Sequence, residues 1–420
     1  MNILVVGNGF DLAHGLPTKY GDFLEFCRKV KGIYTYEPQS IKEWEINNEI
    51  KKILKVASKT RDPKHIHKNS INNLNVHTEV KYLDEFYICI KDNFWVEYFT
   101  KCNMNNKDNW IDFEKEMAEV IQSLDEDMHV LGEKSFRLES NIQKISNFLL
   151  NAKYYGLQKT YKDERDDLLN DLNRLIRAFE IYLDEFVKKI IIKKKSPDIE
   201  KIDINAVLSF NYTHTFFEVY KISKDMRYKD INSFDYIHGE AKVSNSIEID
   251  NIVLGIDEYL SDERKDKDVD FIAFKKYYQR IYKETGCEYK SWLRQIQKKY
   301  DKYLDNKDYY KKMWRKARQS ENLHNVSKWE EEIKNNDEKN SVHNIYFFGH
   351  SLDVTDKDIL RDLILCDNVN TIIFYYNKED LGKKIANLVK VIGQDELIRR
   401  TGGSTKTIEF KLQQDMVKRL

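Results

Sequence analysis

The chain has 420 residues, of which 41% are hydrophobic and 33% are charged. This balance supports a substantial core and excludes an intrinsically disordered protein. The 70 basic and 70 acidic residues cancel, so composition gives no global electrostatic reason for nucleic-acid binding, although a neutral total can conceal a local basic patch.

The chain opens with a short apolar run, residues 3–6, that predicts a buried parallel strand. The run ends in the motif Gly7-Asn8-Gly9-Phe10-Asp11. Its glycines permit a tight turn whose bare backbone N–H groups an anion can approach. Asp11 is expected either to accept a hydrogen bond from a ribose hydroxyl or to cap a helix. Thr18 is expected to cap the next helix.

A helical insertion, residues 37–200, is predicted after the first part of an α/β core, residues 1–36. The insertion has few glycines and many charges, and its apolar residues from Leu168 to Phe186 follow helical spacing. We expect this stripe to be too long for the core alone to cover, and therefore to pack against itself or a second copy of the chain. The lysines at 193–195 suit either a solvated helix end or a nucleic-acid patch.

The second part of the core, residues 201–258, contains three predicted strands at 206–210, 234–237 and 252–254. Each leads into a polar motif, and these motifs are Asn211-Tyr212-Thr213-His214, His238-Gly239-Glu240 and Gly255-Ile256-Asp257. Thr213 or Thr215 is expected to cap a helix. Asn211 can orient a substrate or a water molecule through its amide. His238 suits either a structural or a proton-transfer role.

A second helical insertion is predicted at residues 259–341, and a C-terminal part of the core at 342–420. In the insertion, aromatic residues alternate with lysines, which suits either base stacking or a helix core. The C-terminal part contains predicted strands at 345–348, 371–376 and near 405–410. The first of these ends in the motif Gly349-His350-Ser351-Leu352-Asp353, and Thr355 and Asp358 fit a capping box.

The predicted fold class is α/β, a modified Rossmann-type parallel sheet with two large helical insertions. The five motifs follow predicted strands, and the carboxyl ends of parallel strands lie at one edge of the sheet, where open α/β folds bind ligands. We therefore expect all five motifs to surround one polar cleft. No metal site is assigned, because the HxH pair His65 and His67 lies in the first insertion, away from that edge.

Five cysteines without a CxxC pair indicate reduced thiols rather than a disulfide framework. The sequence begins directly with a predicted strand and contains no run of about 18 apolar residues. We expect a soluble cytoplasmic protein with no membrane partner.

Several of these segments together resemble the bacteriophage abortive-infection AbiH family, and they span the chain. The resemblance lies in VVGNGFDLAHGLPTKYGDFL, SFNYTHTFF, YIHGE, VLGIDE and FFGHSLDVTDKDIL, with Trp110-Ile111-Asp112-Phe113-Glu114 and Phe274-Lys275-Lys276-Tyr277 in the insertions. It implies a bacterial protein that blocks phage growth.

The same motifs are more distantly similar, in chain order, to sirtuin-like NAD-hydrolysing domains. That similarity implies that Gly7 and Gly9 meet the pyrophosphate, that Asn211 and His238 act at the nicotinamide ribose, and that the motif beginning at Gly349 holds the adenosine. The chain departs from the pattern at Asn8, His350 and Thr213, the last of which stands where an Asp is expected.

The resulting hypothesis is an antiphage hydrolase that acts on NAD or another adenine nucleotide and requires no cofactor. The predicted catalytic residues are Asn211 and His238. The predicted ligand-binding residues are Gly7, Asn8, Gly9, Phe10, Asp11, Thr213, His214, Gly239, Gly255, Asp257, Gly349, His350, Ser351 and Asp353.

Two alternatives remain open. One is a metal-dependent nuclease that uses Asp11, Asp257 and His238 on phage or host nucleic acid. The other is a non-catalytic sensor of a nucleotide or a phage protein. A phage-derived trigger and a homo-oligomer formed through the helical insertions are the expected macromolecular partners.

Overall fold

The computed structural model describes residues 1–35, 48, 50–52, 54–55, 74–104, 111–131, 161–220, 233–243, 251–336 and 342–419. In this part of the chain, six strands form one sheet in the order β4-β3-β1-β5-β6-β7, and all neighbouring pairs are parallel. The strands are β1 (Asn2–Val6), β3 (Ala206–Ser209), β4 (Phe234–Tyr236), β5 (His343–Phe348), β6 (Val369–Tyr375) and β7 (Ile408–Leu412). Counted along the chain, the order is 3-2-1-4-5-6, the doubly wound Rossmann arrangement, which reverses direction between β1 and β5.

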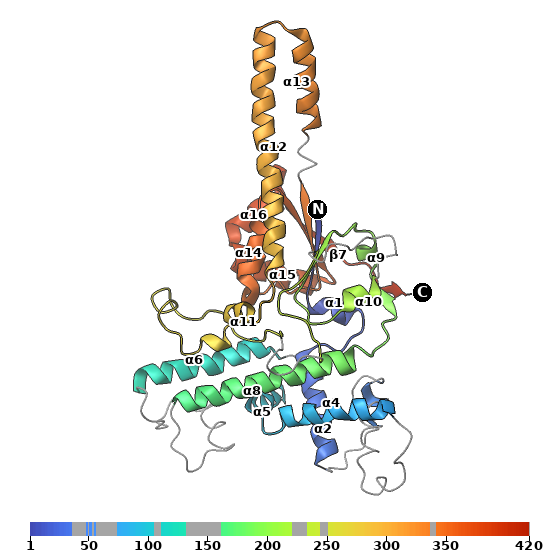
Figure 1. Ribbon diagram of the computed structural model, residues 1–420, viewed down its shortest axis with the longest axis vertical. Coiled ribbons are helices and arrows are strands. Elements are labelled where there is room, and N and C mark those ends of the chain that lie inside the picture. The colour runs from blue at the N-terminus through green and yellow to red at the C-terminus, as the bar shows by residue number, and fades with distance from the viewer. Residues whose placement is uncertain are drawn as a thin grey trace.

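Helices surround this sheet and extend well beyond it (Figure 1). Before β3 the structure contains α1 (Asn8–Ala13), α2 (Tyr20–Tyr34), α4 (Leu74–Ile90), α5 (Phe94–Met104), α6 (Phe113–Leu131), α8 (Tyr161–Ile181), the π-helix η2 (Tyr182–Val187) and α9 (Pro197–Glu200). After β3 it contains α10 (Thr215–Val219), η4 (Ile272–Phe274), α11 (Lys276–Tyr282), α12 (Glu288–Gln319), α13 (Leu323–Asn335), η6 (Val354–Asp356), α14 (Lys357–Leu365), α15 (Lys378–Ile392), α16 (Gln394–Thr401) and η7 (Gly403–Thr405). A separate antiparallel pair joins β2 (Lys194–Lys195) to β8 (Val417–Lys418).

Both faces of the sheet are covered by helices. Ile3 and Val5 of β1 point into a core formed with α12, α14 and α15, whereas Leu4 and Val6 pack with α1, α9 and α10 on the other face. Strands that are buried on both faces need apolar side chains at every position. This explains why the strand sequences do not alternate, and it confirms the prediction of a covered parallel sheet.

A third core lies among helices α2, α4, α5, α6 and α8, which form a layer below the sheet in Figure 1. The apolar stripe of α8 is buried in this core by helices of the same chain, since Leu168, Leu172 and Leu175 are at most 1% exposed and α8 packs against α4 and α5. The stripe therefore packs against helices of the same chain, the first of the two expected arrangements, and by itself gives no reason to infer an oligomer. Residues 132–160 of the predicted first insertion lie outside the described residues.

Helices α12 and α13 form an antiparallel pair, the arm, that projects from the body of the molecule (Figure 1). The first turns of α12 are anchored on the sheet, because Tyr289, Trp292 and Ile296 are buried in the core beside β1 and β5. The helix begins beside β4, where the Asp235 carboxylate accepts a hydrogen bond from the Tyr289 N–H at 2.9 Å. None of the residues of α13 is buried.

The segment predicted as a strand at 252–254 is not part of the sheet. It is extended and buried, but its N–H groups donate to other partners: that of Val253 to the carbonyl of His238 at 2.8 Å, and that of Leu254 to the side chain of Gln279 at 3.0 Å. Its apolar side chains join the core of the helical layer. The apolar run therefore indicates a segment that is buried between the sheet and the helical layer. It does not indicate a strand of the sheet. None of the helices in the described part of the chain combines the length and apolar composition that a membrane crossing requires.

Candidate functional site

The loops that follow β1 and β5 touch at the point where strand order reverses. The Gly9 N–H donates to the Gly349 carbonyl at 2.8 Å, and the Gly7 N–H donates to the Phe348 carbonyl at 3.3 Å. Gly349 has a φ of +69°, and a Cβ atom there would lie 2.1 Å from the Phe10 nitrogen, so no larger residue fits without moving the loops. The prediction that both glycine N–H groups are bare was therefore wrong, because the second loop occupies them.

Two further residues of the first motif have structural partners. Phe10 is buried, and its ring packs against His14 and Phe348. The exposed Asn8 accepts a hydrogen bond from the Thr18 hydroxyl at 2.6 Å. Thr18 is thus bound to this loop and does not cap the next helix, which begins after Lys19.

Asp11 lies inside α1 and joins the first loop to the end of β3. Its Oδ2 atom accepts a hydrogen bond from the Thr213 hydroxyl at 2.6 Å, and Thr213 in turn contacts the Thr215 hydroxyl at 3.0 Å. Burial raises the pKa of Asp11 to about 6, although the hydroxyls of Thr213 and Thr215 and the nearby amide of Asn211 act in the opposite direction. Neither Asp11 nor the two threonines caps a helix, since Gly7 precedes α1 and His214 precedes α10.

Two buried polar atoms of this group lack a hydrogen-bond partner among the described residues. They are Oδ1 of Asp11 and Nδ2 of Asn211. Leaving a buried donor or acceptor unpaired costs about 1–3 kcal/mol, and such atoms call for an explanation. An acceptor and a donor left free on neighbouring side chains suit a polar ligand or a water molecule at the end of β3.

His214, the next residue of the same motif, is partly exposed. Its Nδ1 atom contacts the Tyr236 hydroxyl at 2.9 Å, and its Nε2 atom contacts the carboxylate of Glu240. Burial lowers the pKa of His214, and the carboxylate of Glu240 opposes this effect. The second and third polar motifs thus meet through an imidazole and a carboxylate.

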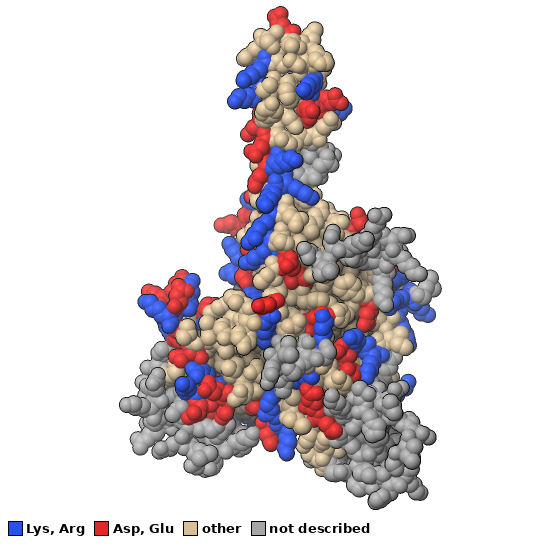
Figure 2. Space-filling model, viewed as in Figure 1, with Lys and Arg blue, Asp and Glu red and all other residues tan. Residues whose placement is uncertain are grey.

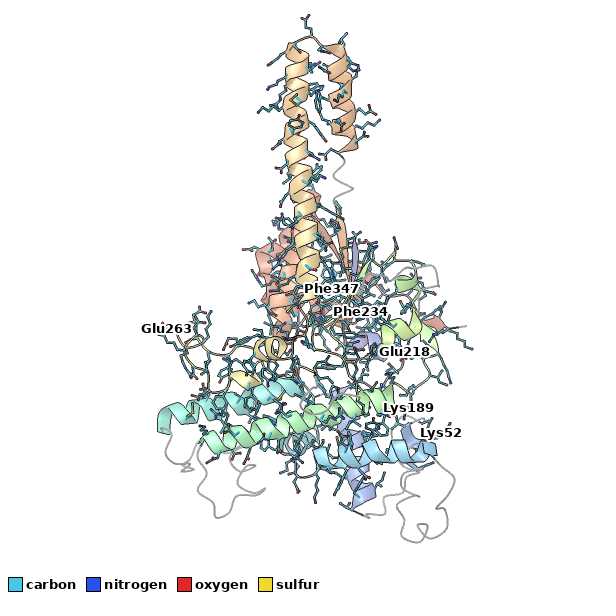
Figure 3. The ribbon with its side chains drawn as sticks, viewed as in Figure 1. Lys52, Lys189, Glu218, Phe234, Glu263 and Phe347 are labelled. Atoms are coloured by element: carbon cyan, nitrogen blue, oxygen red, sulfur yellow. The ribbon has the colours of Figure 1, made fainter. Side chains whose placement is uncertain are left out.

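A pocket adjoins His214, between the end of β3 and the π-helix η2. Its empty space is about 330 Å³, much of it open to solvent, and only about 20 Å³ of it can hold the centre of a water-sized sphere, so in this conformation the enclosed part accommodates about one water molecule. Its walls are Leu16, Leu183, Asp184, Val187, Lys188, Tyr212, Thr213, His214, Thr215, Glu218 and Ala241. In Figure 3, Glu218 of α10 lies above Lys189, which follows the end of η2. Single π-helical turns are frequent at functional sites.

A second polar group is centred on Asp356, in the loop after β5. Its carboxylate lies 3.5 Å from Nε2 of His238 and 3.6 Å from Nε2 of His350. The ammonium of Lys276, at the start of α11, lies 3.4 Å from the same carboxylate and 2.5 Å from that of Glu114 in α6. These five residues, the Asp356 network, bring together both sheet loops and both helical regions.

The network contains one ionised carboxylate and two neutral imidazoles. Burial acts to raise the pKa of Asp356, but the ammonium of Lys276, together with the polar contact to His238, outweighs it and holds that pKa well below its usual range. Burial lowers the pKa of His238, and it lowers that of His350 to about 4. Burial also raises the pKa of Glu114, although Lys276 opposes this. At neutral pH, His238 therefore carries a free lone pair beside an ionised Asp356.

Asp257 lies at the partly exposed border of this network. Burial raises its pKa to about 7, Lys276 lowers it, and Asp356 raises it further. Two neighbouring carboxyl groups whose pKa values are pushed apart are a common arrangement for proton transfer. The two carboxyl groups here are Asp257 and Asp356.

The remaining predicted residues have local roles in the loops. Gly239 has a φ of +79°, and a Cβ atom there would lie 1.9 Å from the Asn251 carbonyl oxygen. At Gly255 a Cβ atom would lie 2.3 Å from the Phe274 carbonyl oxygen. Asp353 caps η6 by accepting from the Thr355 N–H at 3.3 Å. This replaces the capping box expected from Thr355 and Asp358.

Ser351 completes the last motif. It is exposed, and its carbonyl accepts a hydrogen bond from Asn387 of α15 at 3.1 Å. Its hydroxyl accepts from the Asp353 N–H at 3.4 Å. The two central residues of this motif therefore contact different parts of the protein. His350 belongs to the Asp356 network, whereas the backbone of Ser351 contacts α15.

Sequence reasoning did not assign Glu114, Lys276 or Glu240 to the site. Each lies in or beside a quoted motif, but the charges of Glu114 and Lys276 are partnered across 162 residues of sequence. Local spacing carries no signal for such pairs. Among the described residues, no group of three or more His, Cys, Asp or Glu side chains has an arrangement that could hold a metal ion.

The strand order and the polar residues at the carboxyl edge define a Rossmann-like α/β protein. The sequence profile of the family described as Bacteriophage abortive infection AbiH matches residues 3–376, and the chain belongs to that family. This membership indicates a bacterial abortive-infection defence protein. No curated protein and no solved structure gives a significant match to the chain.

Proposed function

We propose that the protein contributes to abortive infection by hydrolysing an adenine nucleotide, with NAD as the first expected substrate. One observation carries this proposal: a neutral buried imidazole, His238, lies 3.5 Å from the ionised Asp356 at the carboxyl edge of a Rossmann-like sheet. Such folds bind ligands at this edge. A neutral imidazole beside a carboxylate is suited to accept a proton.

In the proposed reaction His238 accepts a proton from water, and Asp356 stabilises the resulting imidazolium. The amide of Asn211, whose Nδ2 atom has no hydrogen-bond partner among the described residues, positions the water. The water oxygen bonds to C1′ of the nicotinamide ribose. The bond from C1′ to the ring nitrogen breaks, and nicotinamide leaves as a neutral molecule with the electron pair. Asp257 provides a second titrating carboxyl group closer to solvent.

The pocket beside His214 is the proposed entry to this site. Thr213, His214 and Lys188 would contact polar groups of the nucleotide. The glycine loops after β1 and β5 bond to each other, so the proposed phosphate contacts come from side chains of the pocket rather than from those loops. Lys188, half-exposed just after η2, pairs with the Asp184 carboxylate at 2.5 Å and would supply the positive charge by exchanging that carboxylate for a phosphate.

The test is to incubate the purified chain with NAD, ATP, RNA and DNA, with and without EDTA, and to separate the products by chromatography. We expect nicotinamide and ADP-ribose from NAD. His238→Gln and Asn211→Ala should lower the rate by a factor of about 100 to 10,000, as for loss of a proton-transfer group. His324→Gln, an exposed histidine of α13, is the matched control and should retain the rate.

The same variants are compared in cells challenged with phage. If no nucleotide is cleaved and the folded His238 variant still protects cells, the hydrolase proposal fails. Cleavage of RNA or DNA that EDTA abolishes would instead support a metal-dependent nuclease. A purified chain that is inactive, together with a need for His238 in protection, would indicate that the reaction requires a phage-derived trigger.

A non-catalytic sensor is the second candidate, because the central histidines are buried. His238 is 5% exposed and His350 is 3% exposed, so a substrate reaches them only after the surrounding loops move. A sensor would use ligand binding in the pocket to shift the Asp356 network. It predicts nucleotide binding without turnover, measured by calorimetry on the parent chain.

A further inference from the structure

Five basic residues occupy the last turns of α12, near the outer end of the arm. We call them the tip cluster: Lys311, Lys312, Arg315, Lys316 and Arg318. All five are exposed, and no acidic residue interrupts positions 311–318. In the part of the chain that the structure describes, no ion pair neutralises them. Short segments this rich in Lys and Arg commonly form sites for polyanions.

The arm is positively charged although the whole chain is neutral. Residues 288–336 contain 13 Lys and Arg against 8 Asp and Glu, a net charge of +5. Figure 2 shows basic groups near the base of the arm and again toward its outer end, with acidic groups between them. The zero net charge of the chain therefore conceals a local basic surface near the outer end of the arm, although an acidic group forms the outermost point in Figure 2.

Aromatic side chains lie among these cations. The guanidinium of Arg318 lies 4.8 Å from the ring centre of Trp314, and the ammonium of Lys328 lies 5.0 Å from that of Trp329. Tyr309 contacts the ring of Trp329 at 5.8 Å and is 52% exposed. Proteins that bind single-stranded nucleic acids combine cations for the phosphates with aromatic rings for the bases.

We propose that the outer end of the arm binds nucleic acid through the tip cluster. The cations contact backbone phosphates, and the exposed ring of Tyr309 stacks on a base. An anionic membrane is the competing polyanion, but membrane-surface helices need a broad apolar face beside their charges. Here Tyr310 and Trp329 stack across the arm at 5.9 Å, between α12 and α13, so these rings stabilise the hairpin. The proposal is independent of the proposed hydrolase activity.

The test measures fluorescence anisotropy of a labelled single-stranded oligonucleotide of about 20 residues with the full-length chain, at increasing salt. The tip variant combines Lys312→Gln, Arg315→Gln and Lys316→Gln, because Gln keeps high helix propensity without charge. The matched control combines Lys378→Gln, Lys390→Gln and Lys406→Gln, three exposed lysines of the body. Circular dichroism confirms that both variants fold.

We expect the parent and the control to bind with the same salt dependence. Loss of three phosphate contacts should reduce the slope of log affinity against log salt by about 2 in the tip variant, and weaken binding at least tenfold at low salt. Equal binding by the two variants would overturn the proposal. So would binding by the parent to vesicles containing phosphatidylserine but not to the oligonucleotide, which would assign the cluster to a membrane surface.

Discussion

The Asp356 network and the tip cluster both contain several charged side chains. In the network these side chains are buried and paired, whereas in the tip cluster they are exposed and have no ion-pair partner among the described residues. In the network, Lys276 and Asp356 expose 4% and 12% of their side chains and lie 3.4 Å apart. In the tip cluster, all five cations are exposed to water. A buried charge loses its hydration and needs a partner inside the protein, whereas an exposed charge keeps its hydration and remains available to a ligand. The comparison predicts that changes in the network reduce stability, and that changes in the tip cluster reduce binding alone.

The largest expected effect is that of Lys276→Met. It removes the ammonium and leaves the buried carboxylates of Glu114 and Asp356 without their cation. Breaking a buried pair in this way typically costs about 3–5 kcal/mol. Urea denaturation followed by circular dichroism measures the loss, with the exposed Lys357→Met as control. A loss below about 1 kcal/mol, the range of surface pairs, would show that the network is solvated and would remove the contrast with the tip cluster.

Leu172→Ala tests whether the long stripe of α8 is covered within one chain. Leu172 is fully buried, so truncation should cost about 2–5 kcal/mol. Ile191→Ala, at a 70% exposed position, should change the free energy of unfolding by about 0.5 kcal/mol or less. Sedimentation of the folded Leu172→Ala protein should match that of the parent. If the substitution leaves stability intact but dissociates an oligomer, the stripe is an interface between chains.

Asp257→Asn tests the titration at the border of the network. Burial raises the pKa of Asp257 in the folded protein to about 7, above the ordinary aspartate value of 3.8. The unfolded chain therefore releases this proton more readily, and the stabilising contribution present below pH 3.8 is lost as the pH rises to about 7.

Relative to Asp257→Asn, the parent should consequently lose on the order of 1 kcal/mol between those limits, after allowance for solvent screening. Urea midpoints of the two proteins at pH 5 and pH 8 give this difference. If the urea midpoints of the two proteins change equally between the two pH values, the pKa of Asp257 is not raised. Asp257 is then not suited to proton transfer.

The smallest expected effect belongs to the tip variant with Gln at 312, 315 and 316. Exposed substitutions away from packed features usually change the free energy of unfolding by no more than about 0.5 kcal/mol. Thermal unfolding should therefore not separate this variant from the parent, even where oligonucleotide binding is lost. Marked destabilisation would show that these side chains stabilise the packing of α12 against α13. The tip cluster would then contribute to stability, as the Asp356 network does.

The sheet was predictable because each strand carries its own signal. Apolar runs of strand length identified β1, β3, β4, β5 and β6, and the polar residues after them lie at the carboxyl edge as expected. The run at 252–254 failed because burial between two layers selects the same residues as a covered strand. Sequence alone does not distinguish these two environments.

The site was only partly predictable because its charges meet over long separations. His238 and His350 stood out after their strands, but nothing in the local spacing marked Asp356 as their shared partner. Lys276 appeared only as part of an aromatic and basic segment. The glycines at 7, 9 and 349 were expected to contact a ligand. In the structure the first loop and the loop after β5 instead contact each other at these glycines.

The continuity of α12 has a mechanical consequence. Its first turns are fixed on the sheet through Tyr289, Trp292 and Ile296, and its 32 residues form a rod about 48 Å long at 1.5 Å per residue. A tilt of about 5° at the base of such a rod displaces its far end by about 4 Å. Because the rod starts at the Asp235 hydrogen bond beside β4, three residues before His238, a load applied at the tip acts as torque on the strand that leads into the candidate site.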